Sequence, residues 1–368
     1  MLPTHLLPAV EQRLRKHLSY PVSAVQAIMD HVLTGRGKRL RPLLCLSAAG
    51  CAGPPGPEAL DVACAVEMVH TASLIHDDII DRARVRRGMP SVNRIWGNRA
   101  AVLAGDLILA RALEILIPHS ATGVLSVVSQ AIVAMCASEI EQGDSCFDPS
   151  VSEEGYLARI GGKTASLLKA ACMGGALVSG APKPLVEQLG RFGYCLGIAF
   201  QISDDILDFT GDPDDLGKPV CSDLRQGVLT LPCIYLLAHP ERGPYLRESI
   251  QKRLVSQRLA RIRRDLDETG SLASAIEKAM SFVAGARECA DALHDQETRV
   301  PFSAVVSMLE LRLEGRLSDR QVLAAVGAAG GAGLEPAGPT TSVTAGEIVP
   351  SPALKPAASP EPAAEKSH

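Results

Sequence analysis

Aromatic residues are scarce in this 368-residue sequence, at 3% of the total, and no Asn-Gly or Asp-Gly pair of the kind that closes a β-hairpin occurs. Alternation of polar and apolar residues is also rare, so strands are not indicated. The ten cysteines are scattered and include no Cys-x-x-Cys pair, which argues against a zinc site or a disulfide framework. A formal net charge of −4 gives no basic field, so we expect no nucleic-acid partner.

Two kinds of targeting segment are also missing from the pattern. The N-terminal residues lack a basic stretch followed by an apolar core and a cleavage site. No uninterrupted run of about 18 apolar residues appears, so we expect no integral membrane segment. Together with the cysteine pattern, this predicts a cytoplasmic protein.

Long apolar segments with helical periodicity dominate the sequence. Residues 59–76 and 100–116 are rich in Ala and Leu and are apolar almost all round, which is typical of helices inside a bundle. Gly- and Pro-containing breaks fall at 51–57, 143–150, 179–184 and 210–219. We therefore predict an all-α fold, with one large helical domain over residues 1–326. Residues 327–368, with seven prolines and no aromatic residue, are predicted to form a disordered Pro/Ala/Gly-rich tail.

Two aspartate clusters with the same Asp-Asp-x-x-Asp spacing interrupt these apolar helices. They lie within S-L-I-H-D-D-I-I-D (73–81) and A-F-Q-I-S-D-D-I-L-D (199–208), and comprise Asp77, Asp78 and Asp81, and Asp204, Asp205 and Asp208. Residues four apart share a helix face, so the outer carboxylates of each cluster point together. A solvated acidic face or an acid/base pair would explain one cluster. Two matched clusters among apolar neighbours favour a site where cations, best Mg²⁺, offset the repulsion.

Basic residues suited to phosphate accompany the aspartates. They occur in G-R-G-K-R-L-R-P (35–42), R-V-R-R-G (84–88), G-G-K-T (161–164) and L-G-K-P (216–219), and comprise Lys38, Arg41, Arg86, Arg87, Lys163 and Lys218. The G-G-K-T stretch is not a nucleotide-binding P-loop, because Leu157 stands where that motif needs glycine and no strand is expected before it. Each basic stretch alone is weak evidence, since most basic residues are solvated.

Taken together and in this order, the motifs resemble those of the trans-isoprenyl diphosphate synthases, or polyprenyl synthetases. The likeness extends from about residue 10 to 320 and is strongest to the catalytic component of bacterial heptaprenyl diphosphate synthase. It implies the isoprenoid synthase type of helical bundle around a central cavity, and a prenyltransferase that joins isopentenyl diphosphate to an allylic diphosphate such as farnesyl or geranylgeranyl diphosphate. It also implies a homodimer, or a heterodimer with a small accessory subunit.

The resemblance assigns roles to individual residues. Asp77, Asp81, Asp204 and Asp208 would serve the Mg²⁺ ions, three per site, with Asp78 and Asp205 beside them. The allylic diphosphate would be held by Arg86, Lys163 and Lys218, and isopentenyl diphosphate by Lys38, Arg41, His70 and Arg87. Thr164 and Gln201 would lie next to the reacting carbons.

Product length depends on the residues one turn before Asp77. Ala72 and Ser73 are small, which implies an open chain-length pocket and a long product, although small residues also simply permit close helix packing. The sequence departs from the family at Val228, where a lysine is common, and at Cys221, where glycine is common. Arg82 and Arg84 add positive charge after the first cluster. A shorter-chain synthase and a non-catalytic subunit remain alternatives, whereas a terpene cyclase would lack the Lys38, Arg41 and His70 group.

Overall fold

Helices build nearly all of the structure, which is a computed structural model that describes residues 3–315 except 36, 38 and 212–219. The predicted all-α fold is confirmed, and the predicted tail lies outside the described residues. The α-helices are α1 (Leu7–His17), α2 (Ser23–Thr34), α3 (Leu40–Gly50), α4 (Pro57–Ile80), α5 (Val92–Leu116), α6 (Val124–Asp144), α7 (Glu153–Ile160), α8 (Ser166–Val178), α9 (Lys183–Thr210), α11 (Ser222–Gln226), α12 (Leu231–Ala238), α13 (Gly243–Gln251), α14 (Val255–Glu268), α15 (Ser271–Asp291) and α16 (Gln296–Leu313).

Shorter elements join these helices. They are the 3₁₀ turns Thr4–Leu6 and Ile117–Thr122, the strands β1 (Val85–Arg86) and β2 (Met89–Pro90), and a π-helical turn, Gly161–Ala165, which connects α7 to α8 without a break. Three predicted breaks are loops, since α3 ends at Gly50 before Pro57 starts α4, α6 ends at Asp144 before Glu153 starts α7, and α8 ends at Val178 before Lys183 starts α9. Most of the fourth predicted break, 210–219, lies outside the described residues.

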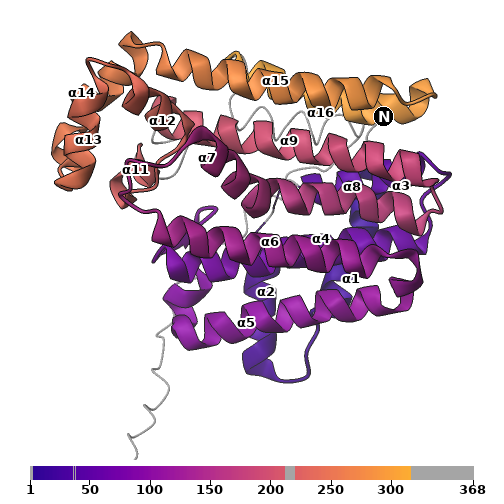
Figure 1. The fold of residues 1–368 in the computed structure, drawn as a ribbon. Coiled ribbons are helices and arrows are strands. Elements are labelled where there is room, and N and C mark those ends of the chain that lie inside the picture. Colours follow the sequence, from indigo (N-terminus) through magenta and orange to yellow (C-terminus); the bar gives the residue numbers. More distant parts are fainter. Residues whose placement is uncertain (1–2, 36, 38, 212–219, 316–368) are drawn as a thin grey trace, which may run out of the picture. The chain divides into compact units, whose positions relative to one another are not determined.

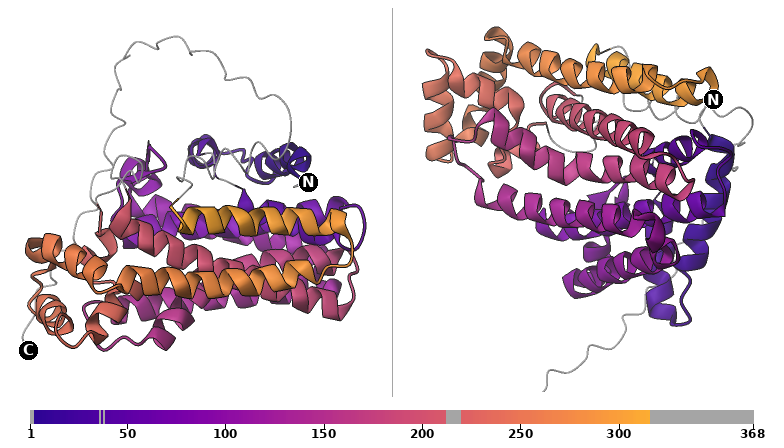
Figure 2. Two further views of the ribbon diagram at one scale, coloured as in Figure 1. Left: turned by 90° about the horizontal axis from the view of Figure 1, so that it is seen from above. Right: turned by 45° about the vertical axis from the view of Figure 1, so that its right-hand side comes forward.

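The long helices pack side by side in the bundle (Figure 1). Helix α4 lies along α5 and also contacts α3 and α8, while α9 packs between α8 and α15. Helices α15 and α16 form a neighbouring pair (Figure 2). One apolar core joins α1–α6 and part of α8, and a second joins α3, α7–α9, α12, α15 and α16. Because α8 contributes to both cores, the two halves share one continuous interior.

Close backbone approach at glycines allows this packing. A side chain at Gly175 would meet the carbonyl oxygen of Cys45 at 2.0 Å, and one at Gly197 would meet the Cα of Ala165 at 2.5 Å. Glycine at these positions therefore lets α8 lie directly on α3, and α9 on the π-helical turn.

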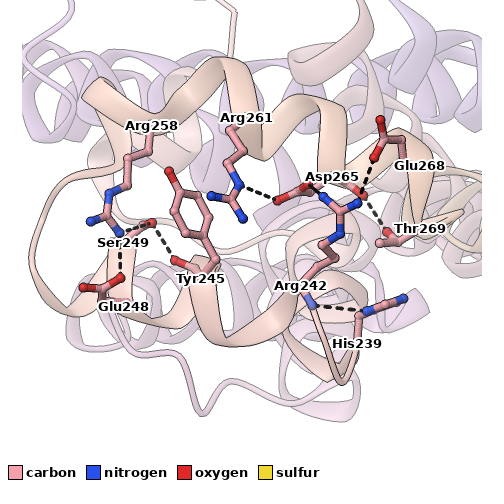
Figure 3. Close-up of polar contacts among 10 residues, drawn as sticks. All are labelled: His239, Arg242, Tyr245, Glu248, Ser249, Arg258, Arg261, Asp265, Glu268 and Thr269. Carbon is pink, nitrogen blue, oxygen red and sulfur yellow. Dashed lines mark hydrogen bonds and ion pairs between the residues drawn. The ribbon is translucent and has the colours of Figure 1, made fainter.

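A smaller core at one end joins α11–α14. Tyr245 lies between two guanidinium groups, with Arg258 at 4.8 Å and Arg261 at 3.7 Å from the ring centroid. Figure 3 shows these residues beside the buried carboxylate of Asp265, which accepts a 2.5 Å hydrogen bond from Arg242. Cation–π contacts and this ion pair link α13 and α14 together.

The short hairpin β1–β2 was not predicted from the sequence. Val85 pairs with Pro90, and Arg86 with Met89. Arg87 and Gly88 have φ of 53° and 78°, the backbone of a tight hairpin turn. With only two residues in each strand, no alternation could reveal it.

Candidate active site

The first aspartate cluster lies at the C-terminal end of α4, where His76 fixes the helix against α5. Its Nε2 lies 3.2 Å from the carbonyl oxygen of Val102 and 3.5 Å from a carboxylate oxygen of Asp106. A side chain at Gly105 would meet His76 Nε2 at 2.2 Å, so glycine makes room for this contact. The last turn of α4 is thus held in place, and it presents carboxylates where the helix dipole is already negative.

Asp77 and Asp81 share a partly buried space with Lys163 and Glu139. Burial raises the pKa of Asp77 to about 6, with Lys163 opposing the rise and the charges of Glu139 and Asp81 adding to it. Burial likewise raises the pKa of Asp81. Burial is the main cause of both shifts, and a cation bound beside these carboxylates would offset its cost.

Lys163 is held on the π-helical turn by groups from α6. Its Nζ lies 2.7 Å from Glu139 Oε2 and 3.3 Å from Gln142 Oε1. Burial works against the charged amine, but Glu139 raises the pKa of Lys163 nevertheless. Glu139 and Gln142 were not among the predicted site residues, although their three-residue spacing puts both on one helix face.

Asp78 takes a different part from its neighbours. It is 4% exposed and accepts hydrogen bonds on Oδ1 from Nε and Nη2 of Arg86, at 2.8 and 2.6 Å. The amide of Asn93 also donates to the backbone carbonyl of Asp78 at 3.1 Å. Asp78 therefore fixes Arg86 and the hairpin at the edge of the site.

The second cluster, on α9, likewise contains a partly exposed carboxylate and a buried one that is held by hydrogen bonds. Asp204 is 42% exposed and receives a hydrogen bond from Arg312. Asp208 is 1% exposed, and its carboxylate accepts from Ser222 Oγ at 3.0 Å and from the backbone N–H of Asp223 at 3.3 Å. Direct metal binding by Asp208 stays a prediction, since the described contacts of its carboxylate anchor the start of α11.

Thr164 and Gln201, both predicted to lie next to the reacting carbons, are hydrogen-bonded to each other. The Thr164 hydroxyl donates to Gln201 Oε1 at 2.6 Å, and Gln201 Nε2 donates to Asp205 Oδ1 at 2.8 Å. Asp205 also accepts a 2.7 Å hydrogen bond from Tyr156, a residue that the sequence did not single out. The π-helical turn that carries Lys163 and Thr164 is a feature often found at functional sites.

A cluster of basic groups surrounds Arg41. Burial lowers the pKa of Arg41, Glu67 raises it and Arg87 lowers it further, and Nε has no hydrogen-bond partner. Burial and the charges of Arg41 and Arg87 hold the pKa of His70 well below its usual range. A partly buried guanidinium whose buried Nε has no partner is suited to an anion that the site receives from outside.

The loop before α3 is shaped to meet this cluster. A side chain at Gly37 would meet Arg87 Nη1 at 2.8 Å, so the loop and the hairpin turn touch at that glycine. Arg39, at φ 49°, forms 2.6 Å ion pairs with Glu11 and the buried Glu67. A cavity of about 80 Å³ opens beside these groups and is lined by Arg39, Arg86 and Arg87 together with apolar side chains. The predicted Lys38 and Lys218 lie outside the described residues.

The remaining predictions concern small residues and the departures from the family. Ala72 is 2% exposed, and Ser73 donates from Oγ to the His70 carbonyl at 2.9 Å. Cys221 has φ 57°, a left-handed backbone that glycine adopts without strain, and its N–H donates to the Asp208 carbonyl at 2.6 Å. The chain thus keeps a glycine-like conformation at a residue with a side chain. All ten cysteines are free.

The carboxylates of the described residues could supply only some of the ligands that a metal ion needs. No three Asp, Glu, His or Cys side chains of the described residues lie close enough to form a complete metal site. Mg²⁺ is commonly bound by one or two carboxylates while water and substrate phosphates complete its shell, so Asp77 and Asp81 fit that ion.

An all-α bundle that carries two Asp-Asp-x-x-Asp clusters and a group of partly buried arginines is suited to binding anionic, diphosphate-like substrates. Comparison with known families then places the chain: residues 22–265 match polyprenyl synthetase, and the chain belongs to that family of prenyltransferases. The expected family is therefore confirmed.

Individual relatives agree with this assignment. The chain is 42% identical over 232 residues to heptaprenyl diphosphate synthase component 2 of Geobacillus stearothermophilus, covering 63% of this chain and 72% of the relative. It is 34% identical over 248 residues to octaprenyl diphosphate synthase of Escherichia coli K12, covering 67% and 77%.

Solved structures show the same fold. A polyprenyl synthase from Caulobacter crescentus CB15, complexed with calcium and isoprenyl diphosphate, superposes with a TM-score of 0.79 at 29% identity, over 86% of this chain and 96% of that one. Heptaprenyl diphosphate synthase from Staphylococcus aureus gives 0.77 at 29% identity, over 84% and 98%. The relatives include heptaprenyl, octaprenyl and nonaprenyl synthases, so they agree on a long-chain family and differ in product length.

Proposed function

We propose that this prenyltransferase is a heptaprenyl-type trans-polyprenyl diphosphate synthase that extends a farnesyl or geranylgeranyl primer with isopentenyl diphosphate. The observation that carries the proposal is the pairing of two environments in one bundle. Asp77 and Asp81 lie near Lys163, whereas the partly buried Arg41 has an unpartnered Nε close to His70 and Arg87. The aspartates would accept a metal ion that carries the allylic diphosphate, and the basic groups around Arg41 would accept the diphosphate of the second substrate.

The chemistry requires ionisation of the allylic substrate without a protein nucleophile. Mg²⁺ supplies positive charge that offsets the charge developing on the departing diphosphate. Asp77 and Asp81 on α4, with Asp204 on α9, would hold it. Lys163 and Arg86 would bind diphosphate oxygens, while Arg41, His70 and Arg87 would position isopentenyl diphosphate. Because burial and the charges of Arg41 and Arg87 lower the pKa of His70, it would bind the diphosphate as a neutral imidazole that donates one N–H.

A cytoplasmic enzyme of this kind would supply a quinone side chain, and its product length would follow from the pocket under Asp77. Ala72 and Ser73 leave that region without a bulky side chain, which supports a long product. A shorter-chain synthase is the alternative, and its product would be geranylgeranyl or farnesyl diphosphate.

A partner subunit would cover apolar surface on α5 and α6. Leu103 on α5 is 58% exposed, and Val133 and Ile140, two turns apart on α6, are 68% and 69% exposed. Helix α6 is also the one described helix whose length and composition would allow a membrane span, although a single such helix is weak evidence. We propose that a second copy or an accessory subunit packs on this face. Ile140→Asp should then shift the assembly to monomer in light scattering, while Val22→Asp, at another exposed apolar residue, should not.

The test of function is an assay of the purified chain with Mg²⁺, farnesyl diphosphate and labelled isopentenyl diphosphate, with products separated by length. A heptaprenyl product that Asp77→Ala abolishes supports the proposal. A product of four units or fewer supports the shorter-chain alternative. Absence of product from folded protein, both alone and with candidate accessory subunits, would indicate a non-catalytic subunit.

A further inference from the structure

Four polar side chains form a continuous hydrogen-bonded row from the interior to the predicted reaction site. Tyr156 on α7 donates to Asp205 Oδ2 at 2.7 Å, and Gln201 Nε2 donates to Asp205 Oδ1 at 2.8 Å. The Thr164 hydroxyl then donates to Gln201 Oε1 at 2.6 Å. Tyr156 is fully buried and Asp205 is 4% exposed, so water cannot replace either partner readily.

The direction of each hydrogen bond follows from the chemistry of the carboxylate. In the structure Tyr156 donates to one oxygen of Asp205 and the amide nitrogen of Gln201 donates to the other, so both oxygens act as acceptors. The amide oxygen must then face Thr164, whose single hydroxyl proton is used to reach it. Two lone pairs of Thr164 Oγ1 remain available, and the oxygen end of the Gln201 amide stays on the side of Thr164.

Tyr156 stands on a rigid base. Ser152 caps the start of α7 by accepting from the N–H of Gly155, and Lys278 pairs with Glu153 at 2.6 Å. The guanidinium of Arg159 lies 5.6 Å from the Tyr156 ring centroid and donates to the Leu229 carbonyl at 2.6 Å. A side chain held by packing and neighbouring hydrogen bonds can in turn fix the groups that it contacts.

We propose that Tyr156 is a positioning residue for prenyl transfer, and that its hydroxyl, acting through Asp205, fixes the amide of Gln201 so that oxygen atoms of Gln201 and Thr164 face the reacting carbons. The inference deepens the proposed function and rests on it. Oriented oxygen dipoles stabilise positive charge that develops during reaction, without reorganising at that moment. Loss of the Tyr156 hydroxyl leaves Asp205 with one donor fewer and lets the Gln201 amide turn over.

The test compares Tyr156→Phe with Tyr235→Phe. Tyr235 is a suitable control because its hydroxyl also bonds to a carboxylate, that of Glu153 on α7. It takes no part in the hydrogen-bonded row. For Tyr156→Phe we expect kcat to fall about tenfold, with KM for both substrates within twofold of wild type. Tyr235→Phe should retain wild-type kcat. A raised KM with unchanged kcat, or equal losses in both variants, would overturn the inference.

A double-mutant cycle shows whether Tyr156 acts through Gln201. If it does, adding Tyr156→Phe to Gln201→Ala should cost less than twofold in kcat, because the amide to be positioned is already gone. Independent, multiplicative losses would overturn the inference.

One readout does not require activity. In the substrate-free protein, the side-chain amide signals of a labelled Gln201 should be sharp in wild type and in Tyr235→Phe, and broadened or shifted in Tyr156→Phe. Unchanged signals would count against the role of Tyr156. An inactive wild type would count against the proposed function, while the amide signals would still decide the positioning role.

Discussion

Arg312, near the end of α16, donates a 2.5 Å hydrogen bond to Oδ1 of Asp204 in the second aspartate cluster. The arginine is 3% exposed, and its guanidinium lies 4.9 Å from the ring centroid of Phe200, whereas Asp204 is 42% exposed. A buried cation from the last described helix therefore pairs with a carboxylate that the family resemblance assigns to Mg²⁺. The Arg312 guanidinium and a bound Mg²⁺ would therefore compete for the carboxylate of Asp204.

Arg312→Met should consequently strengthen Mg²⁺ binding. A partly exposed ion pair contributes up to about 1 kcal/mol, so we expect the apparent Mg²⁺ affinity, measured by calorimetry with inorganic diphosphate present, to rise about fivefold. Arg312→Lys keeps the charge and should stay near wild type. Weaker Mg²⁺ binding in Arg312→Met would mean that Arg312 orients Asp204 for the metal rather than competing with it.

Asp77→Asn should stabilise the metal-free protein while abolishing activity. The pKa of Asp77 in the folded protein is about 6, above the ordinary 3.8, so the fold disfavours the ionised form. The ionised carboxylate of Asp77 therefore destabilises the folded protein fully above pH 6, and this effect disappears as the pH falls below about 4. In EDTA at pH 7.5 we expect the free energy of unfolding of Asp77→Asn to exceed that of wild type by about 2 kcal/mol.

Urea unfolding at several pH values measures this effect. The difference between Asp77→Asn and wild type should shrink between pH 6 and pH 4, and Asp144→Asn, at an exposed position on α6, should show no such trend. A gain in stability that stays constant with pH would show that ionisation of Asp77 is not its cause.

The sequence predicted the helices well, because they depend on local spacing. Apolar periodicity and Gly/Pro breaks define helix ends, and the i, i+4 relation brings Asp77 and Asp81 onto one face. The same spacing could not distinguish the environments of Asp204 and Asp208, since these depend on Arg312 and on the contacts with Ser222. The pairing of Arg312 with Asp204 joins residues 108 positions apart, and no local pattern encodes it. Likewise, nothing in the sequence around Tyr156 indicates its hydrogen bond to Asp205 on α9.

Arg41→Met should impair binding of isopentenyl diphosphate selectively. The substitution keeps an unbranched apolar stem but removes the guanidinium, whose buried Nε lacks a partner. Since charge-assisted hydrogen bonds contribute about 1.5–3 kcal/mol, we expect KM for isopentenyl diphosphate to rise at least tenfold. KM for the allylic substrate should change less than threefold, and Arg94→Met, on the exposed surface of α5, should change neither. Equal rises for both substrates would contradict the separate site.

Arg242→Met tests whether the small core of α11–α14 is structural. Removing Arg242 leaves the carboxylate of Asp265, which is 1% exposed, with only the more distant Arg261 at 3.6 Å among its described ion-pair partners (Figure 3). A buried carboxylate that loses its main partner should cost about 2 kcal/mol in the free energy of unfolding. Thermal unfolding measures this loss, and kcat and KM below the melting temperature should remain those of wild type. A large fall in kcat would show that this end of the bundle contributes to catalysis.

Ser73→Phe should shorten the product. Ser73 is partly exposed on α4, one turn before Asp77, so an aromatic ring can be added there without displacing the core and would obstruct a chain that grows past this position. Ala72→Phe should also shorten the product, but Ala72 is 2% exposed, and inserting a ring into a packed interior costs about 1–3 kcal/mol. The two variants should therefore differ in melting temperature while agreeing in product length, as measured by mass spectrometry of the dephosphorylated products. Ser73→Ala, which removes the hydroxyl without adding bulk, should retain the wild-type distribution. If Ser73→Phe made the same products as wild type, the growing chain would have to leave the site along another face of α4.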